Sequence, residues 1–484
     1  MELIKKQILK VVLITFALMC VVAAVSHILR DTEAANKWAT QEVSPKVAID
    51  RAAVLHPIER VAFSNDWQLQ TERTVKRGGF AFAIIRTGMN RCAPISVSNT
   101  DANLWVMYPT KIDTPSSEGG RTGTFYEALI PRNGSACSES RYVFVEWKPR
   151  IGGVTRIDVG GEIITVNVQI NGALGPQKRP LYVATTNSYL INGHCMTYCR
   201  REGELAHKYA QILADHHIQP IQNWVGLPPI IDGYLDLDHL SDQGLSFRQT
   251  TMAYSNSGYV GFPRASQYKD QITYLRALEA TVRREKLAGK AWVYSIDEPE
   301  ITQALVEHLK LYKLFAPSVK VMITADYDER LEELVDIFSP VLNNLISPNK
   351  ASHGDYQGKE LWSYASCMGS CGPNRRSNIN TPKQPGPDTE LPDFLIDRPA
   401  NRLFDFFKTL NDLRVDGALY YEATEGYPLT RLGINLLNDP WNFGGNGDGL
   451  LLYPGRPGEF GLTEHQPIAS LRIKLIRHAI ENYW

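Results

Sequence analysis

The feature that most constrains this fold is a change in the hydrophobic pattern of the sequence near residue 180. Beyond that point, apolar runs typical of strands alternate with amphipathic helical patterns. The strands are predicted over 181–189, 218–224, 250–257, 291–298, 320–326, 341–347, 360–366 and 417–424. Eight such repeats are typical of a closed parallel barrel, and no glycine-rich phosphate loop follows any strand, as an open nucleotide-binding sheet would require. We therefore predict a (β/α)8 barrel of the TIM type over residues 180–484.

The region before residue 180 has a different pattern. Five short β-rich runs separated by turn residues lie between residues 75 and 175, with no helical pattern between them. This spacing predicts an N-terminal antiparallel β-sandwich over residues 27–175. The stretch NGALGPQKRP, at 171–180, marks the boundary because its Gly, Pro and polar residues interrupt the strand pattern. A chain of 484 residues, 43% of them apolar, can bury two such cores.

The first residues are typical of a targeting segment. MELIKKQILK supplies positive charge, a fifteen-residue apolar run follows at 11–25, and AVS at 24–26 offers small residues to a peptidase. A membrane span needs about 20 apolar residues, so the run is short for one. We predict that residues 1–26 are a signal peptide, with an uncleaved membrane anchor as the alternative. Both predict an exported protein that is periplasmic, secreted or at the cell surface.

Charge and cysteine content limit the partners. Lys plus Arg number 51 and Asp plus Glu 52, so the net charge is 51 − 52 = −1, and nucleic acid is not expected as a partner. Six cysteines follow the leader, and an even number in an exported chain favours disulfides. A four-thiolate zinc site is the alternative for the cysteines of CMTYC and CMGSC, but zinc ligands usually stand two residues apart. We predict no metal and no cofactor.

In a barrel of this type the active site lies at the carboxyl ends of the strands. Those ends carry carboxylates, amides and aromatic rings, which together suit the hydroxyls and apolar C–H faces of a sugar. The predicted substrate-binding residues are Asn187, Trp224, Asn256, Asp326, Asn344, Trp362, Tyr364, Tyr421 and Trp441. For each aromatic side chain, packing in the core is the alternative. A glycan substrate is the partner that this set implies.

The most specific signal is the adjacent pair Asp297 and Glu298 in YSIDEP. Neighbouring side chains of a strand face opposite ways, so the two can converge only where the strand ends, and Pro299 ends it and suits the first turn of a helix. Two close carboxylates resist joint ionisation, which supplies an acid beside a base for glycoside cleavage. The alternative is that Asp297 caps the next helix, with Glu300 completing a capping box.

Seven motifs occur in an order that resembles a known family. They are YSIDEP, ELWSYAS, LIDRPANRLFDFF, DGALYY, NDPW, NGDGLLLYPG and PIASLRIKLIRHAIENY. Together they resemble the barrel region of glycoside hydrolase family 123. The resemblance implies an N-terminal β-sandwich and retaining, substrate-assisted hydrolysis of β-linked N-acetylgalactosamine. Carried over by position, Asp297 would hold the N–H of the 2-acetamido group, while Glu298 would protonate the leaving oxygen and later activate water.

Other readings remain open from the sequence. Glu422 stands where relatives tend to have an aromatic residue, and it could act as a nucleophile with Glu298 as acid/base on a sugar without an acetamido group, if the two lie about 5 to 5.5 Å apart. A non-catalytic carbohydrate-binding surface protein is a further alternative, although it gives no reason to keep two repelling acids together. Arg375 and Arg376, in a long loop at 372–399, could meet an anionic group.

Overall fold

The computed structural model describes most of the chain after the predicted leader. The residues it describes are 53–54, 72–86, 95–98, 102–131, 142–159, 162–175, 179–185, 194–195, 202–222, 227–237, 258–347, 356–365, 380–387, 389 and 391–484. The predicted signal peptide or anchor, residues 1–26, lies outside these ranges. Within them, no helix combines the length and apolar character needed to cross a membrane.

The central element is a parallel sheet of eight strands. Its hydrogen-bonded order is β11 (Gln219–Gln222), β10 (Leu181–Thr185), β19 (Gly417–Tyr420), β18 (Glu360–Ala365), β17 (Ile337–Phe338), β16 (Lys320–Ile323), β15 (Ala291–Ile296) and β14 (Val260–Phe262). The first and the last strand along the chain, β10 and β19, pair with each other, as barrel closure requires. In the described residues no ladder joins β11 to β14, although these strands contact each other. The sheet is therefore curled, and full closure of the predicted barrel is not shown.

Helices follow most of these strands. They are α3 (Glu202–Ala214) after β10, α4 (Gln271–Arg284) after β14, α5 (Gln303–Phe315) after β15, α6 (Leu342–Leu345) after β17 and α7 (Asn401–Asp412) after β18. Only the 3₁₀ turn η4 (Glu329–Leu331) separates β16 from β17. The helical layer is thus thinner than the ideal (β/α)8 pattern, while the α/β character of this region is confirmed.

One predicted strand was wrong. Residues 341–347 contain the single helical turn α6, and the strand of that repeat is β17, four residues earlier. Leu342 and Leu345 are both buried and stand three residues apart, a spacing that places both side chains on one face of a helix. The strand predicted over 250–257 lies outside the described residues, and β14 occupies the next position along the chain.

The inside of the curled sheet is filled by aromatic rings. Tyr182 of β10, Trp292 of β15 and Trp362 of β18 pack on one another with ring centroids 4.8 to 5.4 Å apart. Trp362 is fully buried, and a Cβ at Gly417 of β19 would lie 2.7 Å from its ring. Strand β19 therefore needs glycine at this position to leave room for the indole.

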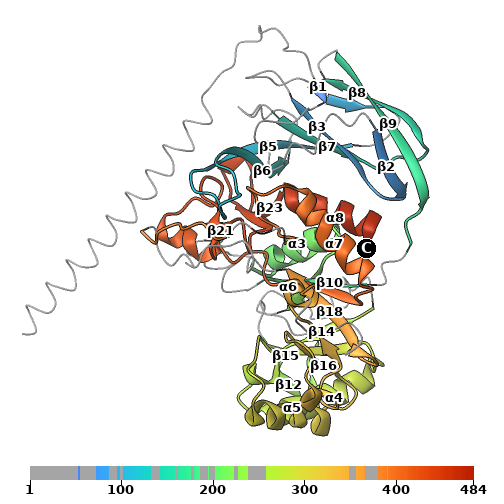
Figure 1. Cartoon of the computed structure of the whole chain (residues 1–484), viewed down its shortest axis with the longest axis vertical. Helices are drawn as coiled ribbons and strands as arrows, with labels where there is room; N and C mark the ends of the chain where they lie inside the picture. The colour runs from blue at the N-terminus through green and yellow to red at the C-terminus, as the bar shows by residue number, and fades with distance from the viewer. Residues whose placement is uncertain are drawn as a thin grey trace, which may run out of the picture.

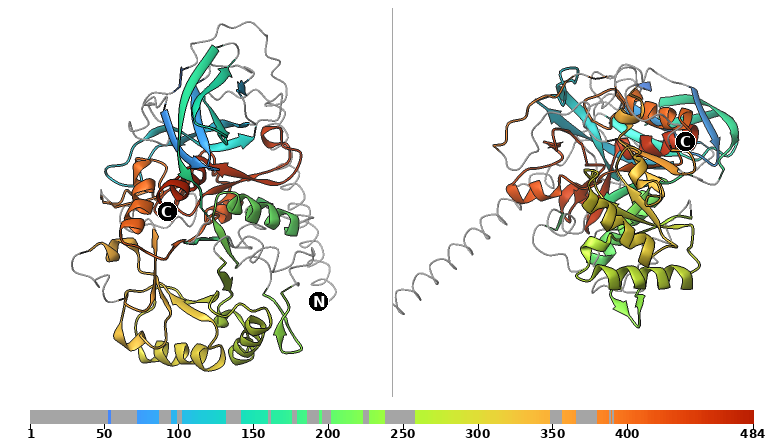
Figure 2. Two further views of the ribbon diagram at one scale, coloured as in Figure 1. Left: turned by 90° about the vertical axis from the view of Figure 1, so that its right-hand side faces the viewer. Right: turned by 60° about the horizontal axis from the view of Figure 1, so that its bottom comes forward.

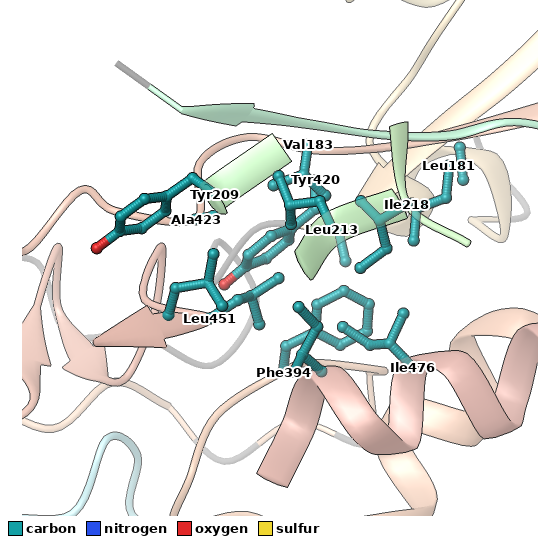
Figure 3. Close-up of a cluster of buried hydrophobic side chains, with 14 of the residues drawn as sticks. Leu181, Val183, Tyr209, Leu213, Ile218, Phe394, Tyr420, Ala423, Leu451 and Ile476 are labelled. Carbon is teal, nitrogen blue, oxygen red and sulfur yellow. The ribbon is translucent and has the colours of Figure 1, made fainter. Parts of the chain in front are cut away.

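The opposite face of the parallel sheet packs on helices. Figure 3 shows Leu181 and Val183 of β10 in one cluster with Leu213 of α3 and Ile476 of α8 (Leu471–Tyr483), all of them buried. Helix α8 lies between the parallel sheet and the N-terminal strands, and contacts α7 as well as β6 (Gly123–Pro131) (Figure 1). The two layers are therefore joined through a shared core.

The N-terminal strands form two sheets, and the predicted antiparallel sandwich of residues 27–175 is not confirmed. The larger sheet has the order β1 (Ala53–Val54), β3 (Ala81–Arg86), β7 (Tyr142–Trp147), β5 (Ala102–Ile112), β6, β23 (Gln466–Ser470) and β22 (Leu452–Gly455). The smaller has the order β2 (Glu72–Arg77), β9 (Glu162–Ala173), β8 (Gly153–Val159) and β4 (Ile95–Val97). Buried residues of both sheets share one core.

Two features separate this arrangement from a purely antiparallel sandwich of residues 27–175. Strands β2 and β9 pair in parallel, and β23 of the C-terminal part pairs with β6. The domain boundary predicted at 175–180 stays a prediction, but the hydrogen-bonded sheet extends across it. Residues 258–347, which carry β14 to β17, lie at the other end of the molecule from these sheets (Figures 1 and 2).

Candidate active site

The two predicted catalytic acids follow β15 directly. The ladder between β15 and β16 shifts register between Tyr294 and Ile296, and Glu298 has a φ of 40°. This left-handed conformation is unfavourable for a residue with a Cβ, and it is found mostly where surrounding contacts enforce it. Both side chains, Asp297 and Glu298, are exposed. The backbone thus turns sharply at the end of the strand, as the pair requires.

The helix-capping alternative for Asp297 is wrong. Helix α5 begins at Gln303, and its N-cap is Thr302, whose hydroxyl accepts a hydrogen bond from the Leu305 N–H at 3.3 Å. Pro299 lies in the irregular stretch before the helix and not in its first turn. Neither acid is therefore needed to start α5.

The Asp297 carboxylate is held through one of its oxygens. Its Oδ1 accepts hydrogen bonds from the hydroxyls of Tyr294 and of Thr324, the latter at 3.0 Å. Its Oδ2 has no hydrogen-bond partner among the residues that the structure describes. Two neutral donors thus orient the carboxylate and leave its second oxygen available to a ligand.

The Glu298 carboxylate is held in a similar way from another strand. Its Oε1 accepts a hydrogen bond from the hydroxyl of Tyr364, the penultimate residue of β18, and its backbone N–H donates to Thr324 Oγ1 at 2.7 Å. No described residue binds its Oε2. Strands β15, β16 and β18 therefore converge on the pair, each through a hydroxyl group.

The two tyrosine hydroxyls remain hydrogen-bond donors at neutral pH. Burial raises the pKa of Tyr294, and the charge of Asp297 raises it further. Burial also raises the pKa of Tyr364, with additional contributions from its hydrogen bond to Glu298 and from the charges of both acids. Both phenols consequently stay protonated at neutral pH, and the hydrogen bonds to the carboxylates persist.

Three residues at this site were missed in the sequence. Tyr294 and Thr324 bind Asp297, while Arg264 lies over the Tyr294 ring with its guanidinium carbon 4.8 Å from the ring centroid. Tyr294 belongs to a strand interior, where an aromatic residue is expected to be core. Thr324 lies inside the strand predicted over 320–326, and Arg264 lies seven residues beyond the strand predicted over 250–257, so no local signal singled out either residue.

The predicted substrate-binding residues have different surroundings. Asp326 and Asn344 are half-buried and paired, with Asn344 Nδ2 donating to Asp326 Oδ2 at 3.1 Å. Trp362 and Trp441 are fully buried, which gives them packing roles and no exposed face for a sugar. The hydroxyl of Tyr421 is also buried. Of the predicted aromatic set, Tyr364 is the one whose described contacts connect it to the acids.

Glu422 is a buried residue, not a third acid at an open site. It is 3% exposed, and its Oε1 accepts hydrogen bonds from the Ala423 N–H at 3.0 Å, the Thr424 N–H at 3.0 Å and the Thr424 hydroxyl at 2.8 Å. These bonds close the turn that follows β19. Its contacts therefore give Glu422 a structural task, in contrast to the exposed Asp297 and Glu298.

Several other predictions cannot be examined in the described residues. Asn187, Trp224, Asn256, Arg375 and Arg376 lie outside them. Cys195 carries a disulfide, and every other cysteine lies outside the described ranges, so the pairing stays a prediction. Where the structure describes the chain, no cluster of three or more His, Cys, Asp or Glu side chains could hold a metal ion.

The comparisons bear on the fold. A solved family 123 glycoside hydrolase from Clostridium perfringens, studied for glycolipid glycan hydrolysis, is similar to 85% of this chain over 82% of its own, with a TM-score of 0.56 and 11% identity. The fold resembles that of a family 123 glycoside hydrolase. The resemblance expected from the seven motifs is thereby confirmed. At 11% identity the likeness concerns the fold alone.

The remaining comparisons add no argument. A putative α-galactosidase/melibiase from Bacteroides fragilis is similar over 60% of this chain and 63% of its own at 11% identity, but its TM-score of 0.22 is too low to interpret. No family model matches the chain, and no curated protein matches it.

Proposed function

We propose that this chain is a glycoside hydrolase that cleaves a β-linked N-acetylhexosamine, such as N-acetylgalactosamine, with retention and with assistance from the substrate. One observation carries the proposal. The adjacent acids Asp297 and Glu298 are exposed at a strand end, and each has one oxygen held by neutral hydroxyls and the other oxygen free of described partners. The fold likeness to a family 123 glycoside hydrolase agrees with this chemistry.

The proposed reaction uses the two free oxygens in turn. Asp297 Oδ2 accepts the N–H of the 2-acetamido group, and the acetamido carbonyl oxygen attacks the anomeric carbon. Glu298 Oε2 gives its proton to the leaving glycosidic oxygen as that bond breaks, which produces an oxazoline-type intermediate. Glu298 then takes a proton from water, and the water oxygen opens the intermediate from the opposite face. Two inversions give net retention.

Substrate assistance explains why the two acids can be neighbours. Glycosidases with a protein nucleophile place two carboxyl groups on either side of the scissile bond, about 5 to 5.5 Å apart. When the substrate supplies the nucleophile, no carboxylate is needed across the ring. The alternative nucleophile, Glu422, is buried and bound by three donors on one oxygen, which counts against a role in attack.

The test is a panel of aryl β-glycosides, each with and without the 2-acetamido group. We expect turnover of the acetamido sugars, a loss of about 10³-fold or more in kcat/KM for Asp297→Asn and Glu298→Gln, and little change for Glu422→Gln. Turnover confined to sugars without the acetamido group, lost in Glu422→Gln, would replace this mechanism by the alternative. Binding of glycans without any turnover would indicate a carbohydrate-binding protein.

We make a separate proposal for the subcellular localisation of the protein. The basic and apolar residues 1–26 support export, with the glycan substrate outside the cytoplasm. N-terminal sequencing of the protein recovered from soluble and membrane fractions distinguishes the two forms. A start near residue 27 supports a cleaved signal peptide, an intact leader in the membrane fraction supports an anchor, and an intact leader in the cytoplasm contradicts export.

A further inference from the structure

Thr324 lies where the turn of the two acids meets the next strand. It follows β16 directly, and its residue is 6% exposed. Three groups meet its hydroxyl oxygen: the Glu298 N–H at 2.7 Å, Asp297 Oδ1 at 3.0 Å and the Tyr294 hydroxyl at 3.0 Å. One small side chain thus contacts both acids and one of the tyrosines that orient them.

The direction of these hydrogen bonds follows from counting protons. A hydroxyl has one proton to donate and two lone pairs to accept with. The Glu298 N–H can only donate, so Thr324 accepts from it. The Thr324 hydroxyl in turn donates its proton to Asp297 Oδ1. Thr324 therefore links the backbone of one acid to the carboxylate of the other.

This link supports an unfavourable backbone conformation. The φ of 40° at Glu298 is unfavourable for a residue with a Cβ and needs contacts that enforce it. The backbone N–H of Glu298 itself donates to the Thr324 hydroxyl, and this hydrogen bond stabilises the turn. Losing the hydroxyl would leave the Glu298 N–H without this acceptor and free the turn to relax.

We propose that Thr324 is the positioning residue of the catalytic pair. Its hydroxyl fixes the turn that exposes Glu298 and orients Asp297 so that Oδ2 faces the acetamido group. The inference deepens the proposed function and rests on it. Thr324 acts through the two acids and does not itself contact the reacting atoms.

Two substitutions separate the hydroxyl from the shape of the side chain. Thr324→Val keeps the branched shape and removes the hydroxyl, whereas Thr324→Ser keeps the hydroxyl and removes the methyl group. Ser295→Ala is a matched control, because the Ser295 hydroxyl is also buried between β15 and β16 but donates to the Met322 carbonyl at 3.0 Å and contacts neither acid.

The experiment measures kcat and KM on an aryl N-acetyl-β-galactosaminide. For Thr324→Val we expect kcat to fall about 10- to 100-fold with KM within about threefold of wild type, because misplaced groups slow the chemical step. Thr324→Ser should stay within about fivefold of wild-type kcat, and Ser295→Ala close to wild type. An unchanged kcat in Thr324→Val, an equal loss in Thr324→Ser, or an equal loss in Ser295→Ala would overturn the proposal.

Crystal structures of the variants give a test that does not need activity. In Thr324→Val we expect Glu298 to leave the left-handed region, and in Thr324→Ser to keep it. If the wild-type enzyme turned over no acetamido glycoside, the proposed function would be refuted. The positioning role would still be tested by the φ of Glu298 in the variant structures. An unchanged φ at Glu298 in Thr324→Val would refute the positioning role alone.

Discussion

The carboxylates after β15 and those around α8 differ in what holds them. Asp297 and Glu298 are exposed and meet neutral hydroxyls. Glu127 of β6 and Glu146 of β7 are buried and meet basic side chains of α8, with Arg472 Nε 2.6 Å from Glu127 Oε1. Lys474 and Arg477 both contact Glu146. The same chemical group therefore occurs in two opposite environments within one chain.

This difference determines what a carboxylate can do in each environment. A buried carboxylate beside a basic side chain is enclosed by protein, so it can join layers but has no access to a substrate. An exposed carboxylate held by neutral donors is oriented and still has a free oxygen. The four predictions below test this division, from the largest expected effect to the smallest.

Breaking the buried ion pair of α8 should have the largest effect. Arg472→Met leaves Glu127 buried without its basic partner, and it also removes donors to the carbonyls of Phe394 and Gly447. We expect the free energy of unfolding to fall by about 3 to 5 kcal/mol, measured by urea denaturation. The exposed pair of Lys111 and Asp113 is the control, and Lys111→Met should cost less than about 1 kcal/mol. Equal losses in both variants would contradict the comparison.

Asp448 is an intermediate case, because it is buried and has no salt bridge among the residues that the structure describes. Burial raises its pKa to about 7. The folded state then holds a proton between about pH 4 and pH 7 that the unfolded state has released, so stability falls as the pH rises through this window. Asp448→Asn should remove that fall, so the variant should gain about 3 kcal/mol of stability relative to wild type between pH 4 and pH 7.

The measurement for Asp448 is urea denaturation at several values between pH 4 and pH 8. Asp405→Asn is the control, since Asp405 is partly exposed on α7 and pairs with Lys408. The control should keep the wild-type pH dependence. A wild-type slope in Asp448→Asn would show that Asp448 is ionised in the folded protein at neutral pH.

Removing the donor to Glu298 should have a smaller effect, seen in activity. Tyr364→Phe leaves Glu298 Oε1 without its hydroxyl partner, and we expect kcat on the acetamido substrate to fall about tenfold. The control is Tyr259→Phe, because Tyr259 donates to Glu360 at 3.1 Å at the amino end of the same strand. This control should keep wild-type kcat. Similar losses in both would indicate a general effect on β18.

The smallest expected effect concerns the N-cap of α5 and tests whether the acids before the helix contribute to capping. Thr302→Ala removes the side chain that caps the helix, and we expect unfolding free energy to fall by about 1 kcal/mol with kcat unchanged. Asp297→Asn should change stability by less than about 0.5 kcal/mol, because the exposed carboxylate has no capping role. If urea denaturation showed a larger loss of stability for Asp297→Asn than for Thr302→Ala, the capping interpretation would be restored.

The sequence predicted the repeating part of the fold well because each repeat carries a local signal. Strands such as Ala291–Ile296 and Glu360–Ala365 are apolar runs bounded by turns. The pairing of β23 with the N-terminal strand β6 was not predictable, since a partner more than 300 residues away leaves no local pattern. The short helix α6 was misread because a single turn of apolar residues also fits a strand.

The site was predicted in part for the same reason. Asp297 and Glu298 stood out as adjacent acids at a strand end. The hydroxyls that orient them come from three strands, so their convergence depends on the curvature of the sheet. The left-handed backbone at Glu298 has no signature in the residue type, because that conformation usually favours glycine or asparagine. Thr324 could therefore be identified only from the arrangement in space.

The pairing of β23 with β6 bears on how the chain is made. During synthesis β6 emerges early, whereas β23 follows more than 300 residues later, so one edge of the N-terminal sheet stays open while the rest of the protein is translated. An open edge can recruit strands from other chains. A ribosome that stalls before residue 466 would release a product with that edge exposed, and such truncated products should aggregate or require a chaperone.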